Sequence, residues 1–181
     1  VVGRPASVVK ELMENSVDAG SRTITVNYKD GGRSLIQVVD DGCGMSETDA
    51  RLAFERHATS KIRRAEDLYQ LASFGFRGEA LPSVASVAEV ELRTRTADQE
   101  IGTQVVIHGG RFVSQEPVQT AVGTQFLVKN LFYNTPARRR FLKEANVEGR
   151  HIRSEFLRVA LCNPEVAFSL YDNDVLIATL P

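Results

Sequence analysis

The chain has 181 residues, of which 43% are hydrophobic and 25% charged, enough for one globular domain with a substantial core. Its 22 Lys and Arg residues nearly balance 23 Asp and Glu residues, which excludes the strongly basic field of a dedicated nucleic-acid binder. Cys43 and Cys162 lack metal-ligand spacing, and no apolar run approaches the roughly 20 residues that span a bilayer. We therefore expect a soluble, unsecreted protein from a reducing compartment. The start at Val1 and the end at Pro181 suggest a fragment.

The first quarter of the chain predicts a helix, a β-hairpin and a second, short helix. Apolar residues recur at helical spacing after Pro5, which suits a first-turn position. Two β-like runs then flank a turn of Asp and Gly, and Ser46 has the spacing of a capping residue. The predicted elements are a helix from Arg4 to Asp18, strands from Thr23 to Tyr28 and from Leu35 to Val39, and a short helix from Ser46 through Phe54.

A long functional loop is predicted from Arg56 to Gly78, with only a weak helical stretch near Ala65 to Leu71. The remaining elements point to a two-layer α+β sandwich with an antiparallel-rich sheet, whose strand order periodicity leaves open. They are strands at Ala88 to Thr94, Thr103 to His108, Arg111 to Gln115 and Thr124 to Val128, helices near Pro136 to Leu142 and Val147 to Leu161, and a hairpin around Asp172 to Asp174.

Three carboxylates and one amide share a face of the first predicted helix. Glu11, Glu14, Asn15 and Asp18 have offsets of 0, 3, 4 and 7, which places them on one stripe opposite the apolar side. Such a stripe is often only a solvated face. It also suits a hard cation, because Asn15 offers a carbonyl oxygen to Mg²⁺ while a neighbouring glutamate activates water.

Two further polar positions lie at strand ends. Asp40 is followed by glycines at positions 42 and 44, which permit positive φ and close approach of a ligand. Its carboxylate either accepts a hydrogen bond from an adenine amino group or belongs to an ordinary acidic turn. Thr124 either donates a hydroxyl hydrogen bond near the same base or fills a β position.

The predicted loop combines glycines, hydroxyls and cations in two runs, Arg56 to Lys61 and Phe74 to Leu81. This composition is typical of a phosphate cradle, and equally of a flexible surface loop, since the second run is not a Walker sequence. Arg138 to Arg140 either contact DNA or decorate a helix.

Four runs taken in order resemble the nucleotide-site motifs of the GHKL ATPase superfamily. Further segments, Arg56 to Ile62, Phe74 to Leu81 and Phe132 to Phe141, resemble the MutL-type DNA mismatch repair proteins within that superfamily, and the likeness covers nearly the whole chain. The four motif runs are Lys10 to Gly20, Asp40 to Gly44, Gly75 to Leu81, and Gly123 with Thr124.

This resemblance implies the Bergerat ATP-binding fold, a mixed and mainly antiparallel sheet with helices on one face and a mobile lid over the nucleotide. The domain would cover residues 1–181, be truncated at its N-terminus and end near a transducer-like domain. Glu11 would be the general base, Asn15 would bind Mg²⁺, and Asp40 would read adenine. The other implied ATP-binding residues are Gly44 beside the base, Thr124 acting through a water, Thr59, Ser60 and Lys61 in the lid, and Gly75, Phe76, Arg77, Gly78 and Glu79 around the phosphates.

The resemblance further implies that ATP closes the lid and drives dimerisation of these domains into a clamp on DNA, which slow Mg²⁺-dependent hydrolysis resets. Implied partners are a second copy, a MutS-type mismatch sensor, weakly and non-specifically bound DNA, and a downstream nuclease or helicase, in the bacterial cytoplasm and without a membrane. As a fragment, the chain is expected to hydrolyse ATP far less well than its parent and to be largely monomeric without nucleotide.

Three alternatives compete with this interpretation. One is another GHKL enzyme such as a topoisomerase subunit, against which the runs Phe76 to Leu81 and Phe132 to Arg138 argue. Another is a nucleotide-gated scaffold without turnover, which would need no positioned base at Glu11. The third is a DNA-binding module using Arg138 to Arg140, which steep salt dependence would reveal.

Overall fold

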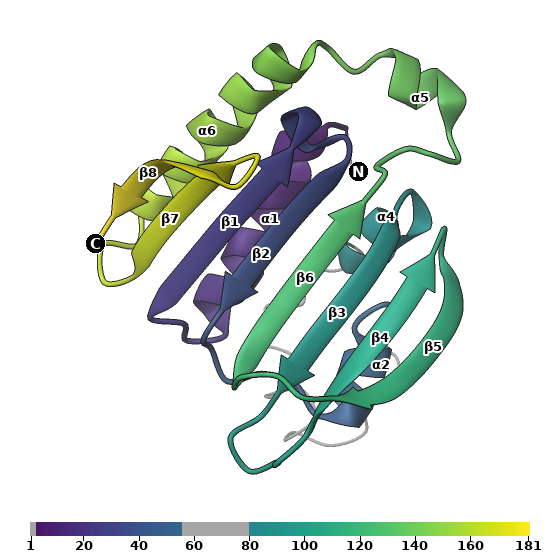
Figure 1. Cartoon of the computed structure of the whole chain (residues 1–181), viewed down its shortest axis with the longest axis vertical. Coiled ribbons are helices and arrows are strands. Elements are labelled where there is room, and N and C mark those ends of the chain that lie inside the picture. Colours follow the sequence, from purple (N-terminus) through teal and green to yellow (C-terminus); the bar gives the residue numbers. More distant parts are fainter. Residues whose placement is uncertain (1–2, 56–79) are drawn as a thin grey trace.

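The computed structural model describes residues 3–55 and 80–181, and within these ranges eight strands form a single sheet. Its order is β5-β4-β3-β6-β2-β1-β7-β8, and neighbours are antiparallel except for the parallel pair β1 and β7 (Figure 1). The strands are β1 (Thr23–Lys29), β2 (Leu35–Asp40), β3 (Glu89–Arg95), β4 (Gly102–His108), β5 (Arg111–Val118), β6 (Gly123–Lys129), β7 (Ala167–Asp172) and β8 (Val175–Leu180).

Helices α1, α2, α4 and α6 form a second layer on one face of this sheet, whereas α5 lies beyond the ends of the strands (Figure 1). The two long helices, α1 and α6, also pack against each other. The helices are α1 (Pro5–Asp18), α2 (Glu47–Leu52), α4 (Ala80–Ser86), α5 (Pro136–Arg140) and α6 (Ala145–Leu161), with a 3-10 turn η1 (Asp30–Gly32) between β1 and β2. The predicted two-layer α+β sandwich is confirmed.

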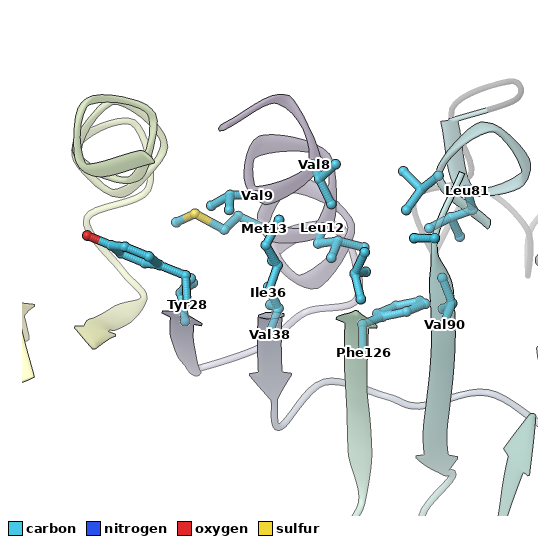
Figure 2. Packing of buried hydrophobic residues seen from close by; sticks show 14 of the residues in the cluster. Val8, Val9, Leu12, Met13, Tyr28, Ile36, Val38, Leu81, Val90 and Phe126 are labelled. Atoms are coloured by element: carbon cyan, nitrogen blue, oxygen red, sulfur yellow. The ribbon is translucent and has the colours of Figure 1, made fainter. Parts of the chain in front are cut away.

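The core lies between the two layers, where α1 meets the central strands (Figure 2). Leu12 and Met13 of α1 are fully buried, as is Ile36 of β2. Burying each such side chain contributes roughly 1.5–3 kcal/mol. Because strand side chains alternate between faces, every second residue of the central strands joins this core, while the opposite face of the sheet is only partly covered.

Four neighbouring strands, β4, β3, β6 and β2, each carry a polar residue on the core face, close to the strand end on the same side of the sheet. Asp40 of β2 pairs in register with Thr124 of β6, which pairs with Thr94 of β3, which in turn pairs with Thr103 of β4. These four residues, the polar row, are 8%, 7%, 0% and 7% exposed. Buried polar groups are costly unless they are hydrogen-bonded, so the polar row must be held by partners.

Most predicted elements are present with ends shifted by one to three residues. The capping role of Ser46 is confirmed, since its hydroxyl accepts a hydrogen bond from the Asp49 N–H at 3.1 Å. Helix α4 was not predicted, because Ala80–Ser86 is short and contains Pro82. The predicted loop from Arg56 to Gly78, with its helical stretch, lies outside the described residues. No helix in residues 3–55 or 80–181 is long and apolar enough to cross a membrane.

Candidate functional site

Asp40 is a buried carboxylate with hydrogen-bond donors on three sides. Its Oδ1 accepts from the backbone N–H groups of Gly42 and Thr124, at 2.9 and 3.1 Å. Its Oδ2 accepts from the hydroxyl of Ser16 on α1, at 2.6 Å. An ionised carboxylate has about four acceptor positions, and one on Oδ2 remains because the nearby Ser21 hydroxyl donates to the Ser16 carbonyl oxygen, at 2.7 Å. Burial raises the pKa of Asp40, and the bonds from Ser16, Gly42 and Thr124 counteract part of that rise.

Asp40 lines a narrow cavity between α1 and the sheet. The cavity is small, with a volume of about 20 Å³, so a ligand ring enters only if the cavity walls move apart. Its walls are mostly apolar, while Asp40 and Thr124 bring polar atoms to one end, which suits a flat, largely apolar ring with a polar edge. The lining residues are Asn15, Ser16, Ala19, Asp40, Gly44, Met45, Leu81, Thr124 and Phe126.

Thr124 is tied to the rest of the polar row through Thr94, a residue that the sequence analysis did not single out. The two hydroxyl oxygens are 2.9 Å apart. Thr94 also donates to the carbonyl oxygen of Gly123 and accepts from the N–H of Met45, both at 2.9 Å. The sequence pattern could have indicated Thr94, because it is a polar residue at a core position of an alternating strand, and such a residue needs a buried hydrogen-bond partner.

Two glycines allow backbones to meet around the cavity. Gly44 has φ 72°, and a Cβ there would lie 1.9 Å from the carbonyl oxygen of Arg95. Gly123 has φ 127°, and its Cβ would lie 2.1 Å from the carbonyl oxygen of Asp40. The sequence predicted that Gly44 lets the backbone approach a base. In the structure its closest approach is to the end of β3, so the glycine is required by the fold itself.

Asn15 places its amide beside this cavity. The residue is 7% exposed, and its Oδ1 is buried without a hydrogen-bond partner among the described residues. A buried carbonyl oxygen without a partner is unfavourable in water-excluded surroundings, and a cation or ligand donor would satisfy it. Within the described ranges, no three His, Cys, Asp or Glu side chains gather as a metal-binding group. Mg²⁺ commonly has one or two protein ligands and completes its shell with phosphates and water, which Asn15 fits.

Of the four residues in the predicted stripe on α1, Asn15 departs from the three carboxylates. Asn15 faces the cavity beside the sheet, whereas Glu14 and Asp18 line a separate groove with α6. Val17 is partly buried and packs against the core. The reason is that the sheet and α6 both cover α1, so its buried arc is wider than one apolar stripe.

Glu11 lies in a third place, a polar groove between the start of α1 and α6. One carboxylate oxygen, Oε2, is buried without a hydrogen-bond partner in the described part of the chain. The structure therefore does not bring Glu11 and Asp40 into one cavity. The groove is lined by Arg4, Ala6, Ser7, Lys10, Glu11, His151, Ser154, Glu155 and Arg158.

Two of the three arginines proposed for DNA contact have partners within the chain. The guanidinium carbon of Arg138 lies 5.0 Å from the ring centroid of Phe132, and Arg139 donates to the Leu131 carbonyl oxygen at 2.8 Å. Arg140 is exposed. The predicted lid and phosphate residues lie outside the described residues: Thr59, Ser60, Lys61, Gly75, Phe76, Arg77, Gly78 and Glu79.

A comparison with known protein families identifies the family that has this fold and this cavity. A family model described as histidine kinase-, DNA gyrase B- and HSP90-like ATPase matches residues 4–130, which include α1 and the whole polar row. The chain belongs to this ATPase family. The GHKL membership expected from the four motif runs is therefore confirmed.

Within this ATPase family, the chain is similar over all 181 residues to DNA mismatch repair proteins MutL. It is 61% identical to the protein from Parabacteroides distasonis and 58% identical to that from Bacteroides fragilis. It spans 29% of the length of each. The structure matches the Aquifex aeolicus MutL ATPase domain complexed with ADP, with a TM-score of 0.79 and 32% identity, over 99% of this chain and 64% of that one. The expected MutL type and Bergerat fold are confirmed.

Proposed function

We propose that this chain binds ATP with its adenine on Asp40 and hydrolyses it slowly with Mg²⁺, as the nucleotide switch of a MutL-type DNA mismatch repair protein. The observation that carries the proposal is the buried Asp40 carboxylate, which has one acceptor position left on Oδ2 and lines a cavity with mostly apolar walls. An exocyclic amino group is the donor that adenine offers to such a position. The ADP complex of the similar Aquifex aeolicus domain supports the same ligand class.

Asn15 is proposed to hold the Mg²⁺ that accompanies the phosphates. Its Oδ1 is buried, uncharged and without a protein partner in the described ranges, as a ligand position for a hard cation requires. A Mg²⁺ ion held by Asn15 would supply positive charge to offset the charge that develops on the phosphate oxygens during transfer to water. Asn15 is the neighbour of Ser16, which binds Asp40, so base and phosphate contacts follow one another along α1.

Glu11 is proposed to be the general base. It lies four residues before Asn15, about 6 Å along the helix axis and in another groove, so the proposal requires the bound phosphates to extend past Asn15 toward it. Its Oε2 has no partner in the described part of the chain and can accept a proton from water. The lid residues from Thr59 to Lys61 and from Gly75 to Glu79 are proposed to complete the phosphate side.

At the level of the whole protein, we propose that ATP binding favours a closed, dimeric state of this domain that acts as a clamp on DNA. Nucleotide shifts such an equilibrium only if it binds the closed dimer more tightly than the open monomer. The proposed partners are a second copy, a MutS-type mismatch sensor, DNA held weakly, and a downstream nuclease or helicase. Hydrolysis then returns the domain to its open state.

Replacing Asn15 by Ala is expected to remove the Mg²⁺ dependence of nucleotide binding. Calorimetry of the full-length protein with a non-hydrolysable ATP analogue should show binding strengthened by Mg²⁺ roughly tenfold, about 1.4 kcal/mol. In Asn15→Ala, affinity with Mg²⁺ should fall to the Mg²⁺-free value. Glu14→Gln is the matched control, because Glu14 lies on the same helix but lines another groove. Absence of any analogue binding by the unsubstituted protein would defeat the proposed function.

The affinity for ATP is expected to fall on acidification at a pH above the usual aspartate range of about 4, since burial raises the pKa of Asp40. Protonation of Oδ2 removes the acceptor for the adenine amino group.

The stability of the fold without nucleotide is expected to change with pH in the opposite direction. A raised folded-state pKa contributes stability that is complete below the unfolded-state pKa and is lost as pH rises through the folded value. Calorimetric titrations and thermal melts at a series of pH values check both trends. Parallel falls in affinity and stability would contradict this assignment.

A further inference from the structure

We propose that Thr94 is a positioning residue for base selection, because it keeps the cavity side of Thr124 a hydrogen-bond acceptor and so favours a base with an amino group over one with a keto group. This inference rests on the nucleotide binding proposed above. Thr94 is 0% exposed and does not line the cavity beside Asp40, so any effect on the ligand passes through its partners.

The direction of the bond between the two threonines follows from a count of protons. Thr94 has one hydroxyl proton, and a carbonyl oxygen can only accept, so that proton is directed to Gly123. The Thr94 oxygen accepts from the Met45 N–H. Its second lone pair is left for Thr124, whose hydroxyl therefore donates to Thr94 across 2.9 Å. This arrangement uses every donor and acceptor position of the Thr94 hydroxyl.

The direction of this bond determines what the Thr124 hydroxyl offers to a ligand in the cavity. With its only proton directed at Thr94, the Thr124 hydroxyl has lone pairs alone to offer the ligand. Thr94 also engages the N–H of Met45, another cavity residue. Asp40 engages the backbone N–H of Thr124 and of Gly42. Asp40 and Thr94 of the polar row thus occupy the N–H groups of Gly42, Met45 and Thr124, and acceptor positions are left on Asp40 and Thr124.

The acceptor positions on Asp40 and Thr124 distinguish purine bases by the substituent at position six of the ring. Adenine has an amino group there, which donates, whereas guanine has a keto oxygen, which only accepts. The keto oxygen would lie against lone pairs of Asp40 and Thr124 without a donor, and unpaired buried acceptors are disfavoured. Removing Thr94's hydroxyl releases the Thr124 proton to turn toward the cavity and also frees the Met45 N–H. Both changes help a keto base.

The test is a double-substitution cycle in the full-length protein, with dissociation constants for non-hydrolysable ATP and GTP analogues measured by calorimetry. Thr94→Val is expected to lower the preference for ATP over GTP about tenfold. Thr94→Ser keeps a hydroxyl and is expected to retain the preference. In a Thr124→Val background, Thr94→Val should change the preference less than about twofold, because the residue through which it acts is gone.

The outcomes separate this inference from the proposed function. If the unsubstituted protein binds neither analogue, the proposed function fails, and the role of Thr94 with it. If it prefers ATP and Thr94→Val weakens both analogues equally, Thr94 is merely structural and only this inference is overturned. Circular dichroism shows whether Thr94→Val folds. Should it not fold, Thr94→Cys, with a thiol that is a weak donor and acceptor, must lower the preference by a smaller factor, and an unchanged preference overturns the inference.

Discussion

Asp40→Asn is expected to weaken ATP binding at least about 100-fold, close to 2.8 kcal/mol, without lowering the stability of the fold. The amide is nearly isosteric with the carboxylate. Its oxygen can keep the bonds from the Gly42 and Thr124 N–H groups, and its nitrogen can donate to the Ser16 hydroxyl. The second proton of that nitrogen then points into the cavity, where it opposes the adenine amino group.

The stability half of this prediction comes from the electrostatics of Asp40. Its raised pKa means that the fold disfavours the charged carboxylate relative to water. A neutral amide removes this cost, so the melting temperature should stay constant or rise. Calorimetry and thermal denaturation measure the two halves separately. Binding by Asp40→Asn that equals the unsubstituted protein would show that Asp40 does not contact the base.

Asp41→Asn is the matched control for this experiment. Asp41 is the next residue, but its Oδ1 accepts from the N–H groups of Arg22 and Thr23 at the start of β1, at 2.8 and 2.9 Å. It does not line the cavity. The control should therefore retain ATP affinity, and a loss as large as that of Asp40→Asn would mean that charge in the loop, rather than the acceptor position, governs binding.

Gly44→Ala is expected to destabilise the fold by more than about 4 kcal/mol. The new Cβ would lie 1.9 Å from the Arg95 carbonyl oxygen, and a contact with backbone at that distance requires β3 or the loop after β2 to move. The positive φ adds a smaller strain of about 1–2 kcal/mol. Since a domain is stable by only about 5–15 kcal/mol, much of the protein should unfold or lose its site.

Gly20→Ala separates these two causes. Gly20 has φ 77°, close to the 72° of Gly44, but nothing lies within 4 Å of its Cβ position. Urea denaturation should show a loss of about 1–2 kcal/mol for Gly20→Ala and a much larger loss for Gly44→Ala. Equal losses would indicate that backbone conformation alone matters and that the contact with Arg95 is relaxed at little cost.

Local patterns in the sequence predicted most of the elements, because strand alternation and helix capping depend on neighbouring residues. The hairpin of β1 and β2 was predicted from two runs and a glycine turn. The position of β6 between β2 and β3 was not predictable in this way. It depends on pairings such as that of Asp40 with Thr124, 84 residues apart, and periodicity carries no information about such partners.

Site residues were predictable where the side chain and its sequence neighbours indicate a role. They were not predictable where the role depends on contacts with distant parts of the chain. Asp40 and Thr124 were expected singly, and the structure places them together on adjacent strands. Thr94 was missed, because its importance comes from partners in two distant segments, Met45 in the loop after β2 and Gly123 with Thr124 at the start of β6. Glu11 and Asn15 share a helix, but the wide burial of α1 directs them to different cavities, which helical spacing alone did not reveal.

The order of strands has a consequence for synthesis on the ribosome. β2 and β3 do not pair with each other, and each has β6 as its inner neighbour. Until residues 123–129 have emerged, a nascent chain can form only the β1–β2 hairpin and the β3–β4–β5 meander, each with an inner edge open to wrong pairing. Asp40 then lacks the Thr124 N–H, so nucleotide cannot guide folding of the first half. Ribosome-bound chains halted before Gly123 are the stage at which this protein most needs protection from aggregation.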